Sequence, residues 1–217
     1  MSFDSWVFDL DNTLYPASSS LFPQIDKRMK EFISRLLQVD VDEAHRLQKQ
    51  YYREFGTTLR GLMSNHAVPP DEFLEYVHEI DHTVLEPNPR LDAALGKLPG
   101  RKFIFTNGSF RHAENVLAQL GLAHHFQDIF DIKAADYVPK PAIEPYRKLV
   151  AQFRVDPANA VMIEDLARNL VAARELGMAT VWVRQEPHPD GLGEGDNHLQ
   201  LADHVTDDLA GWLESRL

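Results

Sequence analysis

The chain has 217 residues, which exceeds the usual size of one domain and predicts either one domain with a sizeable insertion or two modest domains. Hydrophobic residues make up 44% and charged residues 25%, the balance of a folded globular protein rather than a disordered or fibrous one. The formal net charge of −11 argues against a surface that binds nucleic acid or anionic membranes, and the lack of cysteine excludes disulfides, thiolate nucleophiles and Cys-ligated zinc.

The N-terminal segment lacks the basic and apolar regions of a signal peptide, and no stretch approaches the roughly 20 apolar residues of a membrane span. We therefore expect a cytoplasmic protein that works without a membrane or a nucleic acid polymer. A monomer or a homodimer is expected.

Four short apolar segments predict β-strands, at residues 5–9, 102–106, 160–164 and 179–183. Between the later strands lie helical patterns at about 110–120, 143–153 and 166–176, and Gly177 follows the last of them as a helix C-cap would. This alternation predicts an α/β fold with a doubly wound, Rossmann-like parallel sheet. The ligand site of such a sheet lies beyond the carboxyl ends of its strands.

Residues 16–87 break the alternation, because they contain helix-period patterns and little that resembles a strand. The helical patterns span about 23–38, 41–55 and 70–80. Turn-favouring residues flank this region, with Pro16 before a run of serines and Pro87 shortly before Pro89. They predict a small all-helical cap inserted after the first strand.

The rest of the chain, residues 1–15 and 88–217, is then the catalytic core of the predicted fold. Within it, residues 187–197 hold three of the 11 glycines and are predicted to form a surface loop. The chain from Val205 onward is predicted to form a last helix.

Asp9 and Asp11 follow directly on the apolar run of the first strand, where the strand gives way to a turn. Side chains alternate along a strand, so two carboxylates two positions apart point to the same side if extended geometry persists. Packing gives no reason to bring two negative charges together. An ordinary β-turn explains this short motif equally well when it is taken alone.

Three more polar segments follow predicted strands or lie near their ends. They are Thr106 to Ser109, Lys140 between two prolines, and Glu164 with Asp165. Taken singly, these fit helix caps and a solvated loop lysine. Capping does not explain why four carboxylates should meet at one edge of one sheet, where their repulsion is costly unless a cation neutralises it. Oxygen ligands favour Mg²⁺ over zinc.

The order Asp9-x-Asp11-x-Thr13, Thr106-Asn107-Gly108, Lys140-Pro141 and Glu164-Asp165 resembles the four motifs of haloacid-dehalogenase-superfamily phosphohydrolases, over nearly the whole chain. More narrowly, residues 9–16 (DLDNTLYP), 51–56 (YYREFG) and 59–62 (LRGL) resemble the pyrimidine 5′-nucleotidase-like branch. One departure is Leu166, where such relatives often have serine, and it puts a supporting hydrogen bond in doubt.

The resemblance implies a phosphatase in which Asp9 attacks phosphorus and forms an aspartyl-phosphate. Asp11 would protonate the leaving group and then act as a base on water. It also implies a Mg²⁺ ion held by Asp9, the backbone carbonyl of Asp11 and Asp165, with Glu164 reaching it directly or through water.

By the same resemblance, Thr106, the backbone around Asn107 and Lys140 would bind the phosphate oxygens. The expected partner is a small phosphorylated metabolite, with a nucleoside monophosphate first. Candidates for substrate selection, each equally compatible with a packing or surface role, are Tyr15, Tyr51, Tyr52, Arg60 and His112.

Alternative functions are a sugar-phosphate phosphatase, a phosphomutase with the same chemistry and, more distantly, a phospho-acceptor signalling switch of the receiver type. Receivers are about half this length and have no helical insertion, whereas a dehalogenase would not need Asp11 as a proton shuttle. The pair His124-His125 suggests a metal, but it more simply closes a helix.

Overall fold

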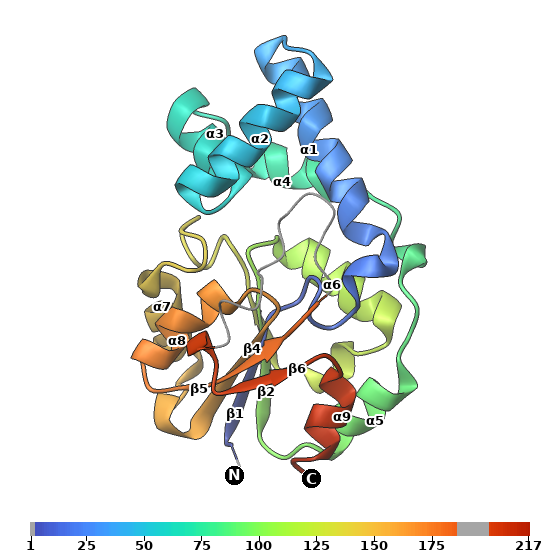
Figure 1. Ribbon diagram of the computed structural model, residues 1–217, viewed down its shortest axis with the longest axis vertical. Helices are drawn as coiled ribbons and strands as arrows, with labels where there is room; N and C mark the ends of the chain where they lie inside the picture. Colours follow the sequence, from blue (N-terminus) through green and yellow to red (C-terminus); the bar gives the residue numbers. More distant parts are fainter. Residues whose placement is uncertain (1–2, 186–199) are drawn as a thin grey trace.

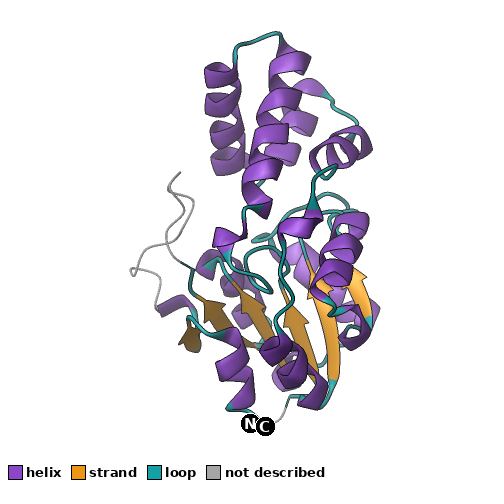
Figure 2. Cartoon of the chain, turned by 90° about the vertical axis from the view of Figure 1, so that its right-hand side faces the viewer, coloured by secondary structure: helices purple, strands orange, loops and turns teal. Residues whose placement is uncertain are grey.

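The computed structural model describes residues 3–185 and 200–217, so the predicted loop at 187–197 lies outside the described residues. The described residues form a parallel six-stranded sheet in the order β3-β2-β1-β4-β5-β6 (Figures 1 and 2). Its strands are β1 (Ser5–Phe8), β2 (Arg101–Phe105), β3 (Asp128–Phe130), β4 (Ala160–Glu164), β5 (Ala179–Val183) and β6 (His204–Thr206). The predicted doubly wound α/β fold is confirmed.

Strand β1 lies in the middle of the sheet, between β2 and β4. Phe8, the last residue of β1, pairs with Ile104 on one side and with Ile163 on the other. The carboxyl ends of β1, β2 and β4 therefore lie at nearly the same height in the sheet. Parallel strands bring the residues that follow them to one edge, at the point where the strand order reverses direction.

Helices cover both faces of the sheet. On one face lie α5 (Pro89–Lys97), α6 (Phe110–Leu120) and α9 (Leu209–Glu214), which pack on Phe8 and Ile104. On the other face lie α7 (Ile143–Phe153) and α8 (Leu170–Glu175), which pack on Val7 and Met162. This alternation of buried side chains along each strand is what a two-sided parallel sheet requires.

Four helices follow β1 and stand over the carboxyl edge of the sheet (Figures 1 and 2). These cap helices are α1 (Leu21–Leu37), α2 (Val41–Phe55), α3 (Thr58–His66) and α4 (Pro70–Val77). They enclose an apolar cluster of their own, in which Ile33 and Leu62 are fully buried. Their amphipathic faces are therefore satisfied largely by one another, as in a small helical bundle.

Short 3₁₀ helices complete the described chain: η1 (Ala17–Ser19), η2 (His82–Val84), η3 (Ala123–His125), η4 (Pro157–Asn159) and η5 (Ala167–Asn169). The segment expected to be helical from residue 166 begins as η5 and continues as α8. Among the described helices, none combines the length and apolar character needed to cross a bilayer.

Two helices and two strands were not expected from the sequence. Helix α5 begins within the proline-rich stretch that suggested a linker, because Asn88 caps it and Pro89 occupies the first helical position, where proline is well tolerated. Helix α3 carries Gly61 in its interior, which weakens the helical pattern. Strands β3 and β6 are only three residues long. The last helix begins at Leu209, and Val205 belongs to β6 instead.

Candidate active site

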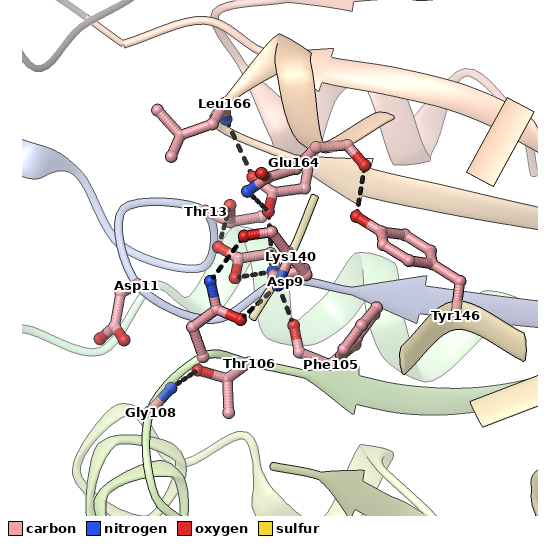
Figure 3. A network of polar contacts seen from close by, with 12 residues as sticks. Asp9, Asp11, Thr13, Phe105, Thr106, Gly108, Lys140, Tyr146, Glu164 and Leu166 are labelled. Atoms are coloured by element: carbon pink, nitrogen blue, oxygen red, sulfur yellow. Dashed lines mark hydrogen bonds and ion pairs between the residues drawn. The ribbon is translucent and has the colours of Figure 1, made fainter. Parts of the chain in front are cut away.

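A buried ammonium group joins two carboxylates where the central strands end (Figure 3). Lys140 Nζ donates hydrogen bonds to Asp9 Oδ1 and to Glu164 Oε1, each at 2.7 Å, and to the carbonyl oxygen of Phe105 at 2.9 Å. Lys140 is 2% exposed, Asp9 6% and Glu164 1%. Charges this deeply buried persist only when they are paired, so the three side chains form one electrostatic unit.

Asn107 holds the backbone that carries this lysine. Its Oδ1 accepts a hydrogen bond from the backbone N–H of Lys140 at 2.9 Å, and its Nδ2 donates to the carbonyl oxygen of Lys140 at 3.4 Å. The side chain of Asn107 therefore positions Lys140 rather than reaching toward a ligand. This role was not visible in the sequence, because the two residues lie 33 positions apart.

Neighbouring residues fix both carboxylates. Thr13 Oγ1 donates to Asp9 Oδ2 at 2.8 Å. Glu164 Oε1 also accepts from Asn169 Nδ2 at 2.6 Å, and Glu164 Oε2 accepts from the backbone N–H of Leu166 at 2.9 Å. The backbone N–H of Leu166 thus supports Glu164, a contact that does not depend on the side chain at position 166.

The pKa values of these acids show that the cluster lacks positive charge. Burial and the nearby Glu164 raise the pKa of Asp9 to about 7, although Lys140 opposes the rise. Burial and Glu164 also raise the pKa of Asp165 well above its usual value. For Glu164 itself, burial raises the pKa, but the charge of Lys140 and the hydrogen bonds from Asp165, Leu166 and Lys140 together outweigh it and lower the pKa. One ammonium group is therefore not enough to neutralise three carboxyl groups.

A divalent cation fits this deficit. Ligand atoms of Asp9, Glu164 and Asp165 all lie within 4.8 Å of one another. Glu164 accepts three hydrogen bonds, whereas each oxygen of Asp9 accepts one, so Asp9 keeps more capacity for a metal ion and Glu164 is the weaker ligand. Trp182 Nε1 donates to the carbonyl oxygen of Asp165 at 2.8 Å and so fixes the turn that carries it. Hard carboxylate oxygens suit Mg²⁺.

Asp11 stands apart from the lysine cluster (Figure 3). Its Oδ1 accepts hydrogen bonds from the hydroxyl of Tyr15 at 2.6 Å and from Nε2 of His112 at 2.8 Å. Burial alone would raise the pKa of Asp11, but His112 and Tyr15 outweigh it and lower that pKa to about 2. Tyr15 and His112 were expected only as candidates for substrate selection, and both contact the second aspartate instead.

Thr106 and Asp11 border the same space. A methyl group added at Gly108 would lie 3.2 Å from Thr106 Oγ1, 3.2 Å from Cδ2 of His112 and 3.7 Å from Asp11 Oδ2. A side chain at this position would therefore fill the gap between them. Glycine keeps the space open and permits a close approach of the backbone to a ligand.

The predicted site residues meet around one cavity of about 220 Å³. Those that line it are Asp9, Asp11, Thr106, Asn107, Lys140, Glu164 and Asp165. They come from the ends of three strands and from the loop before α7, so only the fold brings them together.

The sequence profile of the haloacid dehalogenase-like hydrolases matches residues 4–177. This span covers most of the chain and includes every residue of the acidic and lysine cluster. The chain belongs to the haloacid dehalogenase-like hydrolases. The superfamily resemblance seen in the sequence motifs is thereby confirmed.

Relatives of this hydrolase agree with that assignment. This chain is 30% identical over 194 residues to phosphate metabolism protein 8 of Saccharomyces cerevisiae, and the match covers 81% of this chain and 60% of the yeast protein. It is 25% identical to glyceraldehyde 3-phosphate phosphatase of Methanopyrus kandleri, over 89% of each chain. The solved HAD phosphatase of Thermococcus onnurineus shares the fold, with a TM-score of 0.64, 20% identity and coverage of 100% and 98%.

The cap helices of this hydrolase supply the opposite wall of the cavity. Its apolar part includes Phe22, Ile25 and Met29 of α1. Tyr52 of α2 also lines the cavity and contacts Arg168 of the core through a hydrogen bond. A ligand in this space would therefore contact the carboxylates of Asp9, Asp11 and Asp165 on one side and the cap helices on the other.

Other residues singled out in the sequence have different positions. Tyr51 is buried in the cap, where its hydroxyl lies 2.6 Å from Nε2 of His66, and Arg60 is not part of the cavity wall. His125 ends the short helix η3, as the simpler interpretation of the histidine pair predicts. Its Nε2 lies 2.7 Å from Asp92 Oδ1, and His124, His125 and Asp92 form a second group whose atoms could hold a metal ion.

Proposed function

We propose that this hydrolase is a Mg²⁺-dependent phosphatase that cleaves phosphomonoesters of small metabolites through an aspartyl-phosphate on Asp9. The observation that supports it most is the buried Asp9–Lys140–Glu164 cluster with Asp11 across the same cavity. A paired carboxylate next to a second, separately held carboxylate is the arrangement that nucleophilic attack followed by proton transfer requires.

In the first step an oxygen of Asp9 attacks phosphorus, and the bond from phosphorus to the leaving oxygen breaks. Lys140 and Thr13 keep the Asp9 carboxylate fixed for this attack. Asp11 is ionised in the substrate-free protein, so it must take up a proton as the negatively charged phosphate binds beside it, and it then gives this proton to the leaving alkoxide. In the second step Asp11, now ionised, removes a proton from water, which attacks the acyl phosphate and releases inorganic phosphate and Asp9.

The acidic cluster would hold the metal ion. Its ligands would be the carboxylates of Asp9 and Asp165 and the backbone carbonyl of Asp11, and Glu164 would keep Lys140 in place. A bound Mg²⁺ ion supplies positive charge that lets an anionic ester approach an anionic nucleophile. The raised pKa values of Asp9 and Asp165 support this role, since they reflect an unmet need for positive charge.

The phosphate oxygens would be bound by the hydroxyl of Thr106 and by the backbone around Asn107. All three protons of the Lys140 ammonium group are already engaged. We therefore expect Lys140 to act on the phosphate mainly through its charge. Such preorganised charge and hydrogen bonding stabilise the transition state of phosphoryl transfer.

The size of the cavity favours a short leaving group. Its volume of about 220 Å³ lies below the roughly 300–1,000 Å³ typical of pockets for drug-sized ligands. A phosphate with a two- or three-carbon sugar or acid fits this space better than a nucleotide does. The relative named glyceraldehyde 3-phosphate phosphatase supports the same class of substrate.

A nucleoside monophosphate is the second candidate, as in a pyrimidine 5′-nucleotidase. The motif DLDNTLYP at residues 9–16 and the aromatic side chain of Tyr52 on the cavity wall favour it. This substrate requires the cap to move away from the core. A phosphomutase would differ only in returning the phosphoryl group to a sugar.

Both proposals are tested by measuring phosphate release from a panel of substrates with Mg²⁺ and with EDTA. The panel contains glycerol phosphate, glyceraldehyde 3-phosphate, phosphoglycolate, UMP and CMP. Preference for the short esters supports the first candidate, and preference for UMP and CMP supports the second. Release that persists in EDTA, or in Asp9→Asn, would rule out the proposed chemistry.

A further inference from the structure

Asp11 accepts hydrogen bonds from two side chains that take no part in the proposed steps of hydrolysis. Both the hydroxyl of Tyr15 and Nε2 of His112 lie on the same oxygen, Oδ1, of Asp11. An ionised carboxylate only accepts hydrogen bonds, so Nε2 of His112 carries a proton in this contact. Tyr15 is 4% exposed and His112 is fully buried. Oδ1 is therefore screened from any ligand, and Oδ2 is left as the oxygen that lies near Gly108 and the cavity.

His112 itself is held by a residue that follows the cap. The ring of His78, directly after helix α4, stacks on the ring of His112 with centroids 4.3 Å apart and an angle of 12° between the ring planes. Nδ1 of His78 lies 2.9 Å from the hydroxyl of Ser109, which also caps α6 by accepting from the backbone N–H of His112. Ser109 thus ties both histidines to the start of α6.

The other nitrogen of His112 has no anchor of its own. Its Nδ1 is buried and has no hydrogen-bond partner among the described residues. The orientation of the ring therefore depends on the bond to Asp11 and on packing against His78. A ring held partly by stacking is sensitive to the position of its stacking partner.

We propose that Tyr15 and His112 are positioning residues that orient Oδ2 of Asp11 toward the leaving group, and that through His78 this orientation depends on the position of the cap. The inference rests on the proposed role of Asp11 as acid and base. A proton transfers efficiently only within hydrogen-bond reach, about 2.6–3.2 Å between heavy atoms. A misplacement of about 1 Å can reduce the rate about 100-fold, so a carboxyl group free to rotate would be a poor catalyst.

Comparing two substrates with different leaving groups distinguishes a positioning role of Tyr15 and His112 from a general structural role. An alkyl phosphate needs a proton on its leaving oxygen, whereas p-nitrophenyl phosphate releases a stable phenolate without one. For kcat/KM, which reports the steps up to departure of the leaving group, only the alkyl ester depends on the acid. A misoriented carboxyl group of Asp11 must therefore lower kcat/KM for the alkyl ester more than for p-nitrophenyl phosphate.

The variants are Tyr15→Phe, which removes one hydroxyl and keeps the ring, and His112→Leu, which removes the donor and keeps most of the bulk. We expect each to lower kcat/KM for glycerol phosphate by about 10- to 100-fold and for p-nitrophenyl phosphate by less than about threefold. His112→Gln keeps a donor at the end of the side chain, so it should recover most of the lost activity. His78→Leu should show the same selective loss with a smaller magnitude.

A matched control is His125→Gln, because His125 and Asp92 form a histidine–aspartate contact of similar length outside the cavity. It should leave both substrates unchanged. The double variant Asp11→Asn/Tyr15→Phe should be no slower on glycerol phosphate than Asp11→Asn, since residues that act through one group are not additive. Equal losses on both esters, or additive losses in the double variant, would overturn the inference.

The role of Asp11 and the positioning role of Tyr15 and His112 are refuted by different results. If Asp11→Asn itself leaves kcat/KM for glycerol phosphate unchanged, the proposed function of Asp11 is wrong. If Asp11→Asn is slow while both Tyr15→Phe and His112→Leu remain at the wild-type rate, the chemistry stands and only the positioning network is refuted.

Discussion

Replacing Lys140 by methionine should destabilise the metal-free protein strongly, and more so at high pH. The substitution keeps the length and much of the volume of the side chain but removes the ammonium group. That group lies 2.7 Å from Asp9 Oδ1 and 2.7 Å from Glu164 Oε1. Two buried carboxylates would then face each other without a counter-charge.

The size of the loss follows from these contacts. At 2.7 Å and an effective dielectric constant of about 20, each ion pair has a gross Coulomb energy of about 6 kcal/mol, most of which offsets the cost of burying the charges. Removing one partner of such a buried pair costs about 3–5 kcal/mol. For a chain of this length that corresponds to a fall in Tm of about 6–20 °C.

The pH dependence has a definite sign. Without Lys140, the pKa of Asp9 rises further in the folded state, and the pKa of Glu164, which Lys140 helps to hold low, rises as well. The folded variant then binds more protons than the unfolded chain, so its stability falls as pH rises through the interval between the unfolded and folded pKa values. Each unit of additional pKa shift adds about 1.4 kcal/mol to the loss at high pH. The penalty should be largest at pH 8 and partly relieved at pH 5.

The assay is urea unfolding of wild type and Lys140→Met in EDTA at pH 5 and pH 8. Lys102→Met is the matched control, because Lys102 is 8% exposed and its ammonium group donates to carbonyl oxygens, with Leu98 O at 2.6 Å, and to no carboxylate among the described residues. The control should lose far less stability than Lys140→Met at pH 8. A loss below about 1 kcal/mol for Lys140→Met, or one that is equal at both pH values, would refute the electrostatic argument.

Three further predictions concern the metal and the cap. Mg²⁺ should raise Tm more at pH 8 than at pH 5.5. The pKa of Asp9 is near 7 and that of Asp165 is raised, so the metal-free folded protein loses stability as pH rises, and at pH 5.5 protons compete with the ion for these carboxylates. A Tm gain independent of pH would contradict this. Asp165→Asn should abolish the Mg²⁺-induced rise in a thermal scan, and a retained rise would exclude Asp165 as a ligand. Gly61→Ala should cost about 1–3 kcal/mol in urea unfolding by overpacking, since its new methyl group would lie 2.3 Å from Tyr51 Cβ; unchanged stability would contradict the α2–α3 packing.

The sequence was informative where function depends on residues next to strand ends. Apolar runs mark the central strands, and polar residues that interrupt such runs are visible without a structure. The positions of Asp9, Thr106 and Glu164 follow from this alone, because parallel strands deliver their carboxyl ends to one edge. The motif spacing then led correctly to the superfamily.

The supporting contacts could not be predicted, because they join residues far apart in the chain. His112 lies 101 positions from Asp11, and Asn107 lies 33 positions from Lys140. Periodicity places His112 on a helix but does not say what it faces. A signal was present in one case, since Tyr15 follows Asp11 by four residues and so could turn back onto it.

In the proposed mechanism, Asp9 carries the phosphoryl group during turnover. This role is tested most directly by mixing excess protein with substrate and Mg²⁺, quenching in acid at successive times and analysing the peptide that contains Asp9 by mass spectrometry. We expect a transient gain of one phosphoryl group on Asp9 in the wild type, none in Asp9→Asn, and a phosphorylated species that decays as phosphate appears. Complete turnover without any phosphorylation of Asp9, or full activity in Asp9→Asn, would contradict this mechanism.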